Sequence, residues 1–404
     1  MIICFFAGHS SPLGENNGVT DSLRIFGGEA IARKRKSLRK IKHVWKQITD
    51  LENITTAIMR ASDKKKHRKA VQRILENIDF YALKIQGMLI NQTYIPSPYI
   101  SATITDGRKE RLIHKPQFYP DQIIHWALVL PLQEMWGKSL YPFSCGSIPG
   151  RGLHMGAVAV KRWLKNDKKN TKYCYKIDIS KYYPSIDQDI LINQFRKQIH
   201  EPEVLWLIES IIRSHDKGLP IGNFTSQWFA NLYLKNFDWW VKQDLKVPYY
   251  IRYIDDIVVF HRNKKELHKI RKQIEIKLND DYHVKIKNNW QVFRTDSRGV
   301  DFLGFRFYHY KTIIRKSTCH RMARRIKGVS KKPDISLTDA SAVMSYMGIT
   351  SHCNSKNFIN RYVVPFVSIK KLKEIHRENS KSFPTPKKQS YDYTSKRLCN
   401  YNAI

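Results

Sequence analysis

The sequence predicts an α+β fold, in which short strands and longer helices share one domain. Between Asp50 and Ile90, apolar residues recur at spacings of three and four, as they do on the buried face of helices. Short apolar runs at 173–179, 249–253 and 257–260 have the length and the β-branched or aromatic content of strands. A chain of 404 residues is long enough to bury a sizeable core of this kind.

The first third of the chain divides into a leader and a more regular region. Residues 1–32 show no strong period, so we expect a poorly structured leader, and a basic run begins at Arg33. From Tyr94 to Pro120, proline-rich turns alternate with short β-type runs. Residues 121–136 are apolar enough to predict a buried helix.

Helices and strands alternate through the rest of the chain. A glycine-rich loop at 146–152 precedes a predicted helix, and residues 190–213 and 228–245 are also predicted to be helical. A basic helical piece at 320–328 begins a helical region that extends to residue 369. A tail rich in lysine, serine, proline and tyrosine follows it.

The net charge of the chain indicates its partner. Lys and Arg number 71 against 35 acids, which gives a formal net charge of +36. Such self-repulsion is typical of a protein that binds a polyanion, so we expect nucleic acid along an extended track. A solvated surface and an anionic membrane are alternatives, but no basic amphipathic stretch carries a lipid-anchor motif. The apolar start is too short to span a bilayer, so we expect no membrane partner.

Cysteine usage indicates the compartment. The six cysteines lie far apart, and none belongs to a C-x-x-C pair. The pattern supports neither a zinc site nor a disulfide framework, and it is typical of reduced thiols in the cytoplasm.

Two acidic positions carry the strongest chemical signal. Asp178 ends an apolar strand, and Asp255 and Asp256 lie between two apolar runs that predict a tight hairpin. Neighbouring carboxylates between such strands are costly unless a positive group neutralises them, which a divalent cation does well. Alone, each position is typical of a cap or a turn. Together they predict a site for two Mg²⁺ ions, with Mn²⁺ as a substitute, for nucleotidyl transfer.

The segment Tyr253–Asp256 resembles the Tyr-x-Asp-Asp signature of reverse transcriptases, and the strand that ends in Asp178 resembles the same family's first catalytic motif. The resemblance covers about residues 50–366 and implies an RNA-directed DNA polymerase with a right-hand fold. We expect the following boundaries: a leader at 1–32, fingers and palm at 33–315, a helical thumb at 316–370 and a basic tail at 371–404.

The resemblance also assigns roles around the carboxylates. It implies that Asp178, Asp255 and Asp256 are the catalytic metal ligands, with Ile179 as a further metal ligand. Tyr183 matches the steric gate, where a bulky ring excludes a ribose 2′-hydroxyl. By itself, an aromatic residue after a strand is commonly part of the core, so Tyr183 takes this role only from the neighbouring motifs.

Residues 221–227 read Ile-Gly-Asn-Phe-Thr-Ser-Gln, where most reverse transcriptases show Gln-Gly-x-x-x-Ser-Pro. We expect Ile221, Gly222 and Gln227 at the incoming nucleotide, with Gly222 allowing a close backbone approach. The departure resembles the reverse transcriptases of diversity-generating retroelements of bacteria and phages. That resemblance implies error-prone copying of a template RNA for mutagenic retrohoming. The implied partners are a DNA or RNA primer, dNTPs and a small basic helical accessory protein.

Arg111 and Lys109 lie in a segment that resembles the fingers strand that cradles the incoming triphosphate, a role that suits a guanidinium group. The family usually follows with Asp-Arg, but this chain has Gln122, so one positive charge is missing. Lys285 and Lys287 both lie near the place of a lysine that protonates pyrophosphate. The solvent face of a strand explains these two lysines equally well.

Four arginines are candidate contacts to the nucleic-acid backbone. Arg151 lies in the glycine-rich loop, and Arg321, Arg324 and Arg325 share one helix face at i, i+3 and i+4. A solvated face is the usual interpretation of such a run. With a net charge of +36 and no compensating acids expected nearby, contact with the template–primer backbone is favoured.

Two alternatives remain. A reverse transcriptase of another bacterial lineage, of the group II intron or phage-defence type, is disfavoured by the motif at 221–227 and by the lack of a maturase extension. A non-catalytic RNA-binding protein on a polymerase fold is disfavoured by the three intact carboxylates. Only 94 residues (404 − 310) follow Tyr310, so we expect no ribonuclease H domain.

Overall fold

The computed structural model describes residues 43–106 and 109–381, except for the side chains of residues 106, 109, 376 and 378–381. The expected leader and most of the expected tail therefore lie outside the described residues. The chain forms two compact units. The first runs to Leu303 and includes Phe307–Tyr310, and the second comprises Gly304–Arg306 and the chain from Lys311 onward. We had placed the boundary near residue 315, and the division lies a few residues earlier.

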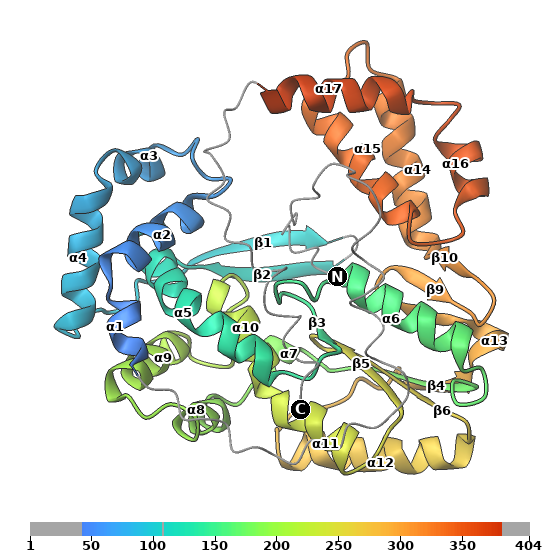
Figure 1. Cartoon of the computed structure of the whole chain (residues 1–404), viewed down its shortest axis with the longest axis horizontal. Helices are drawn as coiled ribbons and strands as arrows, with labels where there is room; N and C mark the ends of the chain where they lie inside the picture. Colours follow the sequence, from blue (N-terminus) through green and yellow to red (C-terminus); the bar gives the residue numbers. More distant parts are fainter. Residues whose placement is uncertain (1–42, 107–108, 382–404) are drawn as a thin grey trace, which may run out of the picture. The chain divides into compact units, whose positions relative to one another are not determined.

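The first unit begins with helices and contains most of the secondary structure (Figure 1). Its helices are α1 (Val44–Ile48), α2 (Leu51–Ser62), α3 (Lys69–Glu76), α4 (Ile78–Ile90), the π-helix η1 (Phe118–Gln122), α5 (Ile123–Ser139), α6 (Leu153–Asn166), α7 (Tyr182–Ser185), α8 (Gln188–Arg196), α9 (Pro202–Arg213), α10 (Phe224–Tyr233), α11 (Lys235–Gln243), α12 (Lys264–Asp280) and α13 (Thr295–Arg298).

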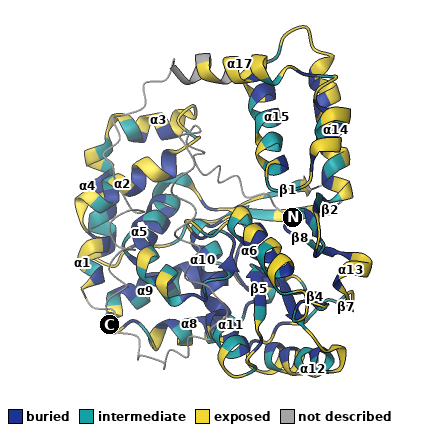
Figure 2. Cartoon of the chain, turned by 45° about the vertical axis from the view of Figure 1, so that its right-hand side comes forward, coloured by how far each residue is buried: buried dark blue, intermediate teal, exposed yellow. Residues whose placement is uncertain are grey.

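A five-stranded sheet, which we call the palm sheet, organises this unit. Its strand order is β3-β5-β6-β4-β7, from β3 (Ser144–Cys145), β4 (Tyr173–Asp178), β5 (Tyr249–Tyr253), β6 (Asp256–His261) and β7 (Gln291–Arg294). β3 is parallel to β5, and the other pairs are antiparallel. Helix α12 packs against β4, β6 and β7, while α6 packs against β3 and β5. The central strands are largely buried, whereas α12 carries many exposed residues (Figure 2).

A separate hairpin precedes the palm sheet in the chain. β1 (Ile100–Asp106) pairs antiparallel with β2 (Lys109–Lys115), and Ile104 lies opposite Arg111. The amide of His114 on β2 donates to the carbonyl of Ile221 at 3.0 Å. This bond attaches the hairpin to the loop that leads into α10, so two segments far apart in sequence meet at one place.

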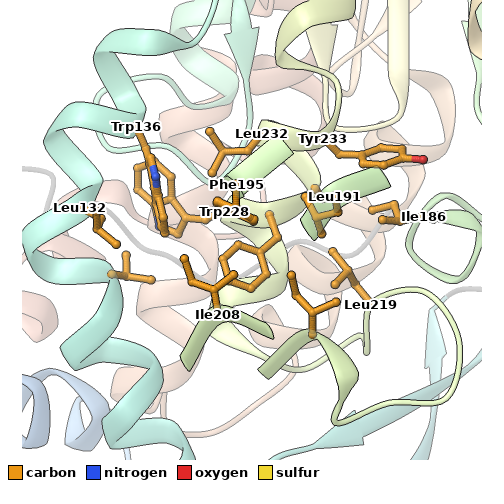
Figure 3. Close-up of a cluster of buried hydrophobic side chains, with 14 of the residues drawn as sticks. Leu132, Trp136, Ile186, Leu191, Phe195, Ile208, Leu219, Trp228, Leu232 and Tyr233 are labelled. Carbon is orange, nitrogen blue, oxygen red and sulfur yellow. The ribbon is translucent and has the colours of Figure 1, made fainter. Parts of the chain in front are cut away.

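One part of the core of the first unit lies among helices α5, α8, α9 and α10 (Figure 3). The ring of Trp136 lies 5.9 Å from the rings of Phe195 and Trp228, and all three are almost fully buried. Aromatic contacts at this spacing add to the free energy gained by burying the rings. This core supports α10, which begins within the segment 221–227.

The second unit is mainly helical. It contains β10 (Thr312–Ile314), α14 (Lys316–Ser330), α15 (Leu337–Thr350), α16 (Lys356–Tyr362) and α17 (Ile369–Lys381). Its core gathers Met322 and Ile326 from α14 with Val343 from α15. Two short strands, β8 (Val300–Phe302) and β9 (Phe305–Phe307), lie at the division between the units.

The predicted strands and helices are present, but some predicted helical regions are interrupted. The helical region expected at 50–90 is three helices, because the basic residues after Ser62 form turns, with Lys64 at φ 63°. Residues 190–213 form two helices, and Pro202 begins the second at a position where its missing N–H costs nothing. The expected strand at 249–253 matches β5 residue for residue.

Candidate active site

The site is built on the hairpin between β5 and β6. Tyr253 pairs with Asp256, so Ile254 and Asp255 form a two-residue turn. Ile254 has φ 58°, a left-handed conformation that a β-branched residue rarely adopts. The buried side chains of both strands fix the ends of this turn, so its strained backbone holds Asp255 at the tip.

Strand β4 brings Asp178 to the same place. Asp178 lies opposite Asp256 in the β4–β6 pairing, and the amide of Ile179 donates to the carbonyl of Asp255 at 3.0 Å. The structure therefore brings together the three predicted aspartates, from strands separated by more than seventy residues of chain. The buried side chain of Ile179 is a hydrocarbon without a donor atom, so its backbone carbonyl is the candidate metal ligand.

The pKa of one carboxylate, that of Asp255, is shifted from its ordinary value. Burial raises the pKa of Asp255 to about 6, and the charge of Asp178 and a hydrogen bond with it act in the same direction. Lys287 opposes this shift. Two carboxyl groups held this close resist ionising together unless a cation lies between them.

Two lysines neutralise part of the negative charge. The Nζ of Lys287 lies 2.5 Å from Asp178 Oδ1, and the Nζ of Lys176 lies 3.5 Å from Asp256 Oδ2. Lys287 is held there because its amide donates to the carbonyl of Asp178 at 2.9 Å. The sequence did not distinguish Lys285 from Lys287, and the ion pair singles out Lys287.

The oxygen donors suit a hard divalent cation, although the protein side chains alone do not form a complete ligand set. Among the described residues, no three His, Cys, Asp or Glu side chains already surround a common point. The close pair Asp178 and Asp255 offers carboxylate oxygens, and Mg²⁺ typically completes its octahedron with water and phosphate oxygens. The residues therefore fit a metal that is held jointly by protein and substrate.

A family match covers this site. Residues 108–307, which include all three aspartates and Lys287, match the family model described as "Reverse transcriptase (RNA-dependent DNA polymerase)". This stretch of the chain is therefore similar to a reverse transcriptase domain. The match and the mixed architecture of the first unit confirm the expected α+β right-hand polymerase fold.

Curated relatives match over part of their length. The chain is 32% identical over 206 residues to the retron Ec73 reverse transcriptase of Escherichia coli, covering 46% of this chain and 61% of the relative. It is 26% identical over 115 residues to nuclear intron maturase 1, mitochondrial, of Arabidopsis thaliana, covering 28% of this chain and 16% of the relative. The chain thus spans less than two thirds of each relative.

The solved structures that match the chain include telomerases. One is telomerase from Candida albicans with a TWJ fragment of telomeric RNA, at 12% identity and a TM-score of 0.41, covering 72% of this chain and 60% of that one. Another is apo telomerase from Candida tropicalis, at 11% identity and a TM-score of 0.41, covering 70% and 60%. Likeness at this level is distant. In the described part of the chain, every helix is too short or too polar to cross a membrane.

Within the reverse transcriptase domain, Tyr183 lies on α7, five residues after Asp178. Its side chain is half-buried, and its ring contacts Tyr182 at 5.9 Å, edge to face. The carbonyl of Tyr183 accepts from the amide of Leu219 at 2.9 Å. This bond places Tyr183 beside the loop that leads to the segment 221–227.

The structure gives a reason for Gly222 within the fold. We expected this glycine to let the backbone approach a nucleotide. That expectation stays a prediction, and within the chain Gly222 has φ 146°, so that a Cβ there would lie 2.2 Å from the carbonyl oxygen of His114. The close neighbour is therefore strand β2, and the glycine is needed to attach the hairpin. Ile221 and Gln227 of the same motif are half-buried.

The fingers hairpin carries the predicted phosphate ligands. Arg111 lies on β2 and is half-buried, while the side chain of Lys109 lies outside the described residues. Gln122 replaces a positively charged residue of the family, but a lysine from another element lies next to it. The Nζ of Lys65, from the turn after α2, donates to Gln122 Oε1. Fifty-seven residues separate the two, so sequence inspection gave no signal of this pairing.

Arg151 has a structural environment that disfavours the expected template contact. Its guanidinium donates to the carbonyls of Gly137 at 2.8 Å, Tyr141 at 3.3 Å and Leu140 at 3.4 Å. These carbonyls lie at and just beyond the C-terminal end of α5, where they lack intrahelical donors. Arg151 thus caps α5 and joins it to the glycine-rich loop.

In the second unit, Arg321, Arg324 and Arg325 are exposed on α14, as expected for one face. The expected lack of nearby acids was wrong. Arg325 donates to Asp339 Oδ1 at 2.8 Å, and Lys332 lies 2.6 Å from Asp339 Oδ2. Arg325 therefore holds α14 to α15, and Arg321 and Arg324 remain the better candidates for nucleic acid.

Proposed function

We propose that the chain is an RNA-directed DNA polymerase that extends a DNA or RNA primer along a template RNA. The observation that carries the proposal is the convergence of Asp178, Asp255 and Asp256 inside a matched reverse transcriptase domain. Two divalent ions bound there would favour the deprotonated primer 3′-oxygen and neutralise the charge of the departing pyrophosphate. Asp178, Asp255 and Asp256 would hold them, with the Ile179 carbonyl as a further ligand.

Other residues of the domain take supporting roles in this proposal. Lys287 lies at Asp178 and is placed to protonate the pyrophosphate as it leaves. Arg111 binds triphosphate oxygens, as its guanidinium group suits this role. The ring of Tyr183 excludes a ribose 2′-hydroxyl, which selects dNTPs.

The test is primer extension on an RNA template. Asp255→Ala and Asp178→Ala should each reduce nucleotide incorporation by more than about a hundredfold, because each removes a ligand that acts on the transition state. Asp244→Ala is the matched control, since Asp244 is an exposed aspartate at the end of α11. Circular dichroism reports whether each variant is folded. Substantial incorporation by a folded Asp255→Ala protein would refute the assignment.

For the biological setting, we propose mutagenic retrohoming by a diversity-generating retroelement, with a small basic helical accessory protein. The support is the Ile-Gly-Asn-Phe-Thr-Ser-Gln sequence at 221–227. A retron-type role is the second candidate, favoured by the 32% identity to the retron Ec73 reverse transcriptase. A neighbouring pair of near-identical DNA repeats that differ mainly at adenines of one copy would support the first. Its absence would favour the second.

A further inference from the structure

An arginine that the sequence did not single out lies beside the catalytic turn, completely buried. Arg252 on β5 and Asp238 on α11 both have side chains with 0% exposure. The guanidinium Nε donates to Asp238 Oδ1 at 2.7 Å, and one terminal nitrogen donates to Asp238 Oδ2 at 2.6 Å and to Ser144 Oγ at 2.7 Å. A buried ion pair is weak evidence for stability, because removing two charges from water is costly. The position of the Arg252–Asp238 pair beside the catalytic turn suggests a functional role instead.

The remaining guanidinium nitrogen points to the turn. It donates to the carbonyl oxygen of Ile254 at 2.9 Å, while the amide of Ile254 donates to the carbonyl of Cys145 at 3.3 Å. The Ile254 carbonyl belongs to the planar peptide that leads into Asp255, so holding that oxygen orients the backbone of Asp255. The two bonds hold both peptides around Ile254 in a conformation that this residue rarely adopts.

The same arginine reaches the nucleotide-binding motif through one residue. Its guanidinium lies 3.3 Å from the carbonyl oxygen of Asn231 and 3.4 Å from Asn231 Oδ1. The side-chain amide of Asn231 donates to the carbonyls of Gln227 and Gly146, both at 3.0 Å. Gln227 ends the motif at 221–227. A continuous buried chain of polar contacts therefore links that motif to the Asp255 turn.

We propose that Arg252 is a positioning residue that fixes the Ile254–Asp255 turn for metal binding, and that Asn231 keeps this turn in register with the nucleotide-binding motif. The inference rests on the proposed function, since it assigns Asp255 to the metal. Asp238 and Ser144 fix the planar guanidinium so that one nitrogen remains directed at the turn. A lysine would keep the charge but could not form this fork.

The experiment measures Mn²⁺ binding to the full chain by electron paramagnetic resonance, without nucleic acid or nucleotide. Arg252→Lys should weaken Mn²⁺ binding by about tenfold or more, the range found when partners behind metal ligands are removed. Tyr250→Phe is the matched control. Tyr250 is equally buried and donates to Asp238 at 2.5 Å, but that bond does not reach the turn. Its Mn²⁺ affinity should stay within about twofold of the parent.

A paired variant keeps the test decisive if Arg252→Lys does not fold. Arg252→Met with Asp238→Leu removes both charges together, so no uncompensated charge stays buried. A folded paired variant with weakened Mn²⁺ binding supports the proposal, and one with parental affinity overturns it. Failure of both variants to fold would also overturn it, because the pair would then be a stability element.

A reference variant separates the two proposals, and a kinetic measurement tests the link to the motif. Asp255→Ala must itself weaken Mn²⁺ binding; if it does not, the proposed metal site has failed rather than the role of Arg252.

Asn231→Ala should raise the KM for dNTP by about threefold or more, while Mn²⁺ affinity stays nearer the parental value. An unchanged KM would contradict the link through Asn231.

Discussion

At the catalytic turn, lysine side chains partly neutralise the negative charge of the aspartates in the absence of substrate. Asp255 lies beside Asp178 with a pKa raised to about 6, and Lys287 forms an ion pair with Asp178. Without Lys287, the pKa of Asp255 would rise further, because the lysine favours the ionised form. Lys287 and Lys176 therefore neutralise only part of the negative charge of the three aspartates, and a divalent cation would neutralise the rest.

Tyr183 is predicted to select the sugar. Replacing it with Val opens space beside α7, so the ratio of ribonucleotide to deoxynucleotide incorporation should rise by at least about tenfold, or ~1.4 kcal/mol. The measurement is kcat/KM for matched rNTP and dNTP substrates. Tyr182→Phe is the control, because Tyr182 is buried and its hydroxyl donates to the Ala230 carbonyl at 2.6 Å. An unchanged ratio in Tyr183→Val would mean that the ring only fills space.

Ile221 is predicted to lower fidelity. Its hydrocarbon side chain offers no hydrogen bond to an incoming nucleotide, and a lost neutral hydrogen bond is worth on the order of 0.5–1.5 kcal/mol. Ile221→Gln should therefore reduce misincorporation severalfold. The substitution leaves the Ile221 carbonyl free to keep its bond with His114.

Sequencing of cDNA made by the parent, Ile221→Gln and Ile221→Leu gives the error frequency opposite each template base. Ile221→Leu retains an apolar side chain and should keep the parental spectrum. Equal error spectra for all three proteins at comparable activity would place the source of errors elsewhere, with Arg111 the next candidate.

Elements with a local sequence pattern were predictable, and contacts between distant elements were not. The apolar run of β5 and its acidic turn identified the hairpin, because strand burial and turn formation depend on neighbouring residues. Lys176 could have been found the same way, since it lies two residues before Asp178 and so on the same face of β4. Arg252 gave no such signal, because its partner Asp238 comes from helix α11.

Helix α5 carries a titratable group that should affect acid stability. Burial lowers the pKa of His125 to about 3, and its Nδ1 has no hydrogen-bond partner among the described residues. The unfolded chain binds a proton near pH 6.5 and the folded chain does not, so the free energy of unfolding falls as pH decreases from 6.5 toward 3. At pH 5 this loss is about 2 kcal/mol.

His125→Leu should flatten that dependence. Denaturant unfolding at pH 7 and pH 5 gives the difference in unfolding free energy, which should be smaller in His125→Leu by about 2 kcal/mol. His67→Leu is the control at an exposed histidine and should keep the parental difference. Equal pH dependence in parent and His125→Leu would show that other groups dominate acid unfolding.

At the scale of the whole molecule, a net charge of +36 exceeds what any single site needs. Some of this charge belongs to elements that do not carry the aspartates. The turn after α2 exposes Lys64, Lys66 and Arg68, and α14 exposes Arg321 and Arg324. Charges spread in this way contact many phosphates weakly, so their contribution is a dependence on salt rather than recognition of a sequence.

Binding of template RNA should therefore weaken steeply with salt. If six phosphates of a single strand are neutralised, the slope of log K against log salt is roughly −4, and affinity falls more than about a hundredfold between 50 and 200 mM. Fluorescence anisotropy with labelled RNA measures the slope. Replacing Arg321 and Arg324 with Gln should make it shallower by about 1.4, at about 0.7 per phosphate contact. Arg151→Gln should leave it unchanged, because that guanidinium is bound to the end of α5. An affinity that does not change with salt would contradict an extended electrostatic track. Equal slopes in the parent, the double variant and Arg151→Gln would show that α14 does not contact the RNA backbone.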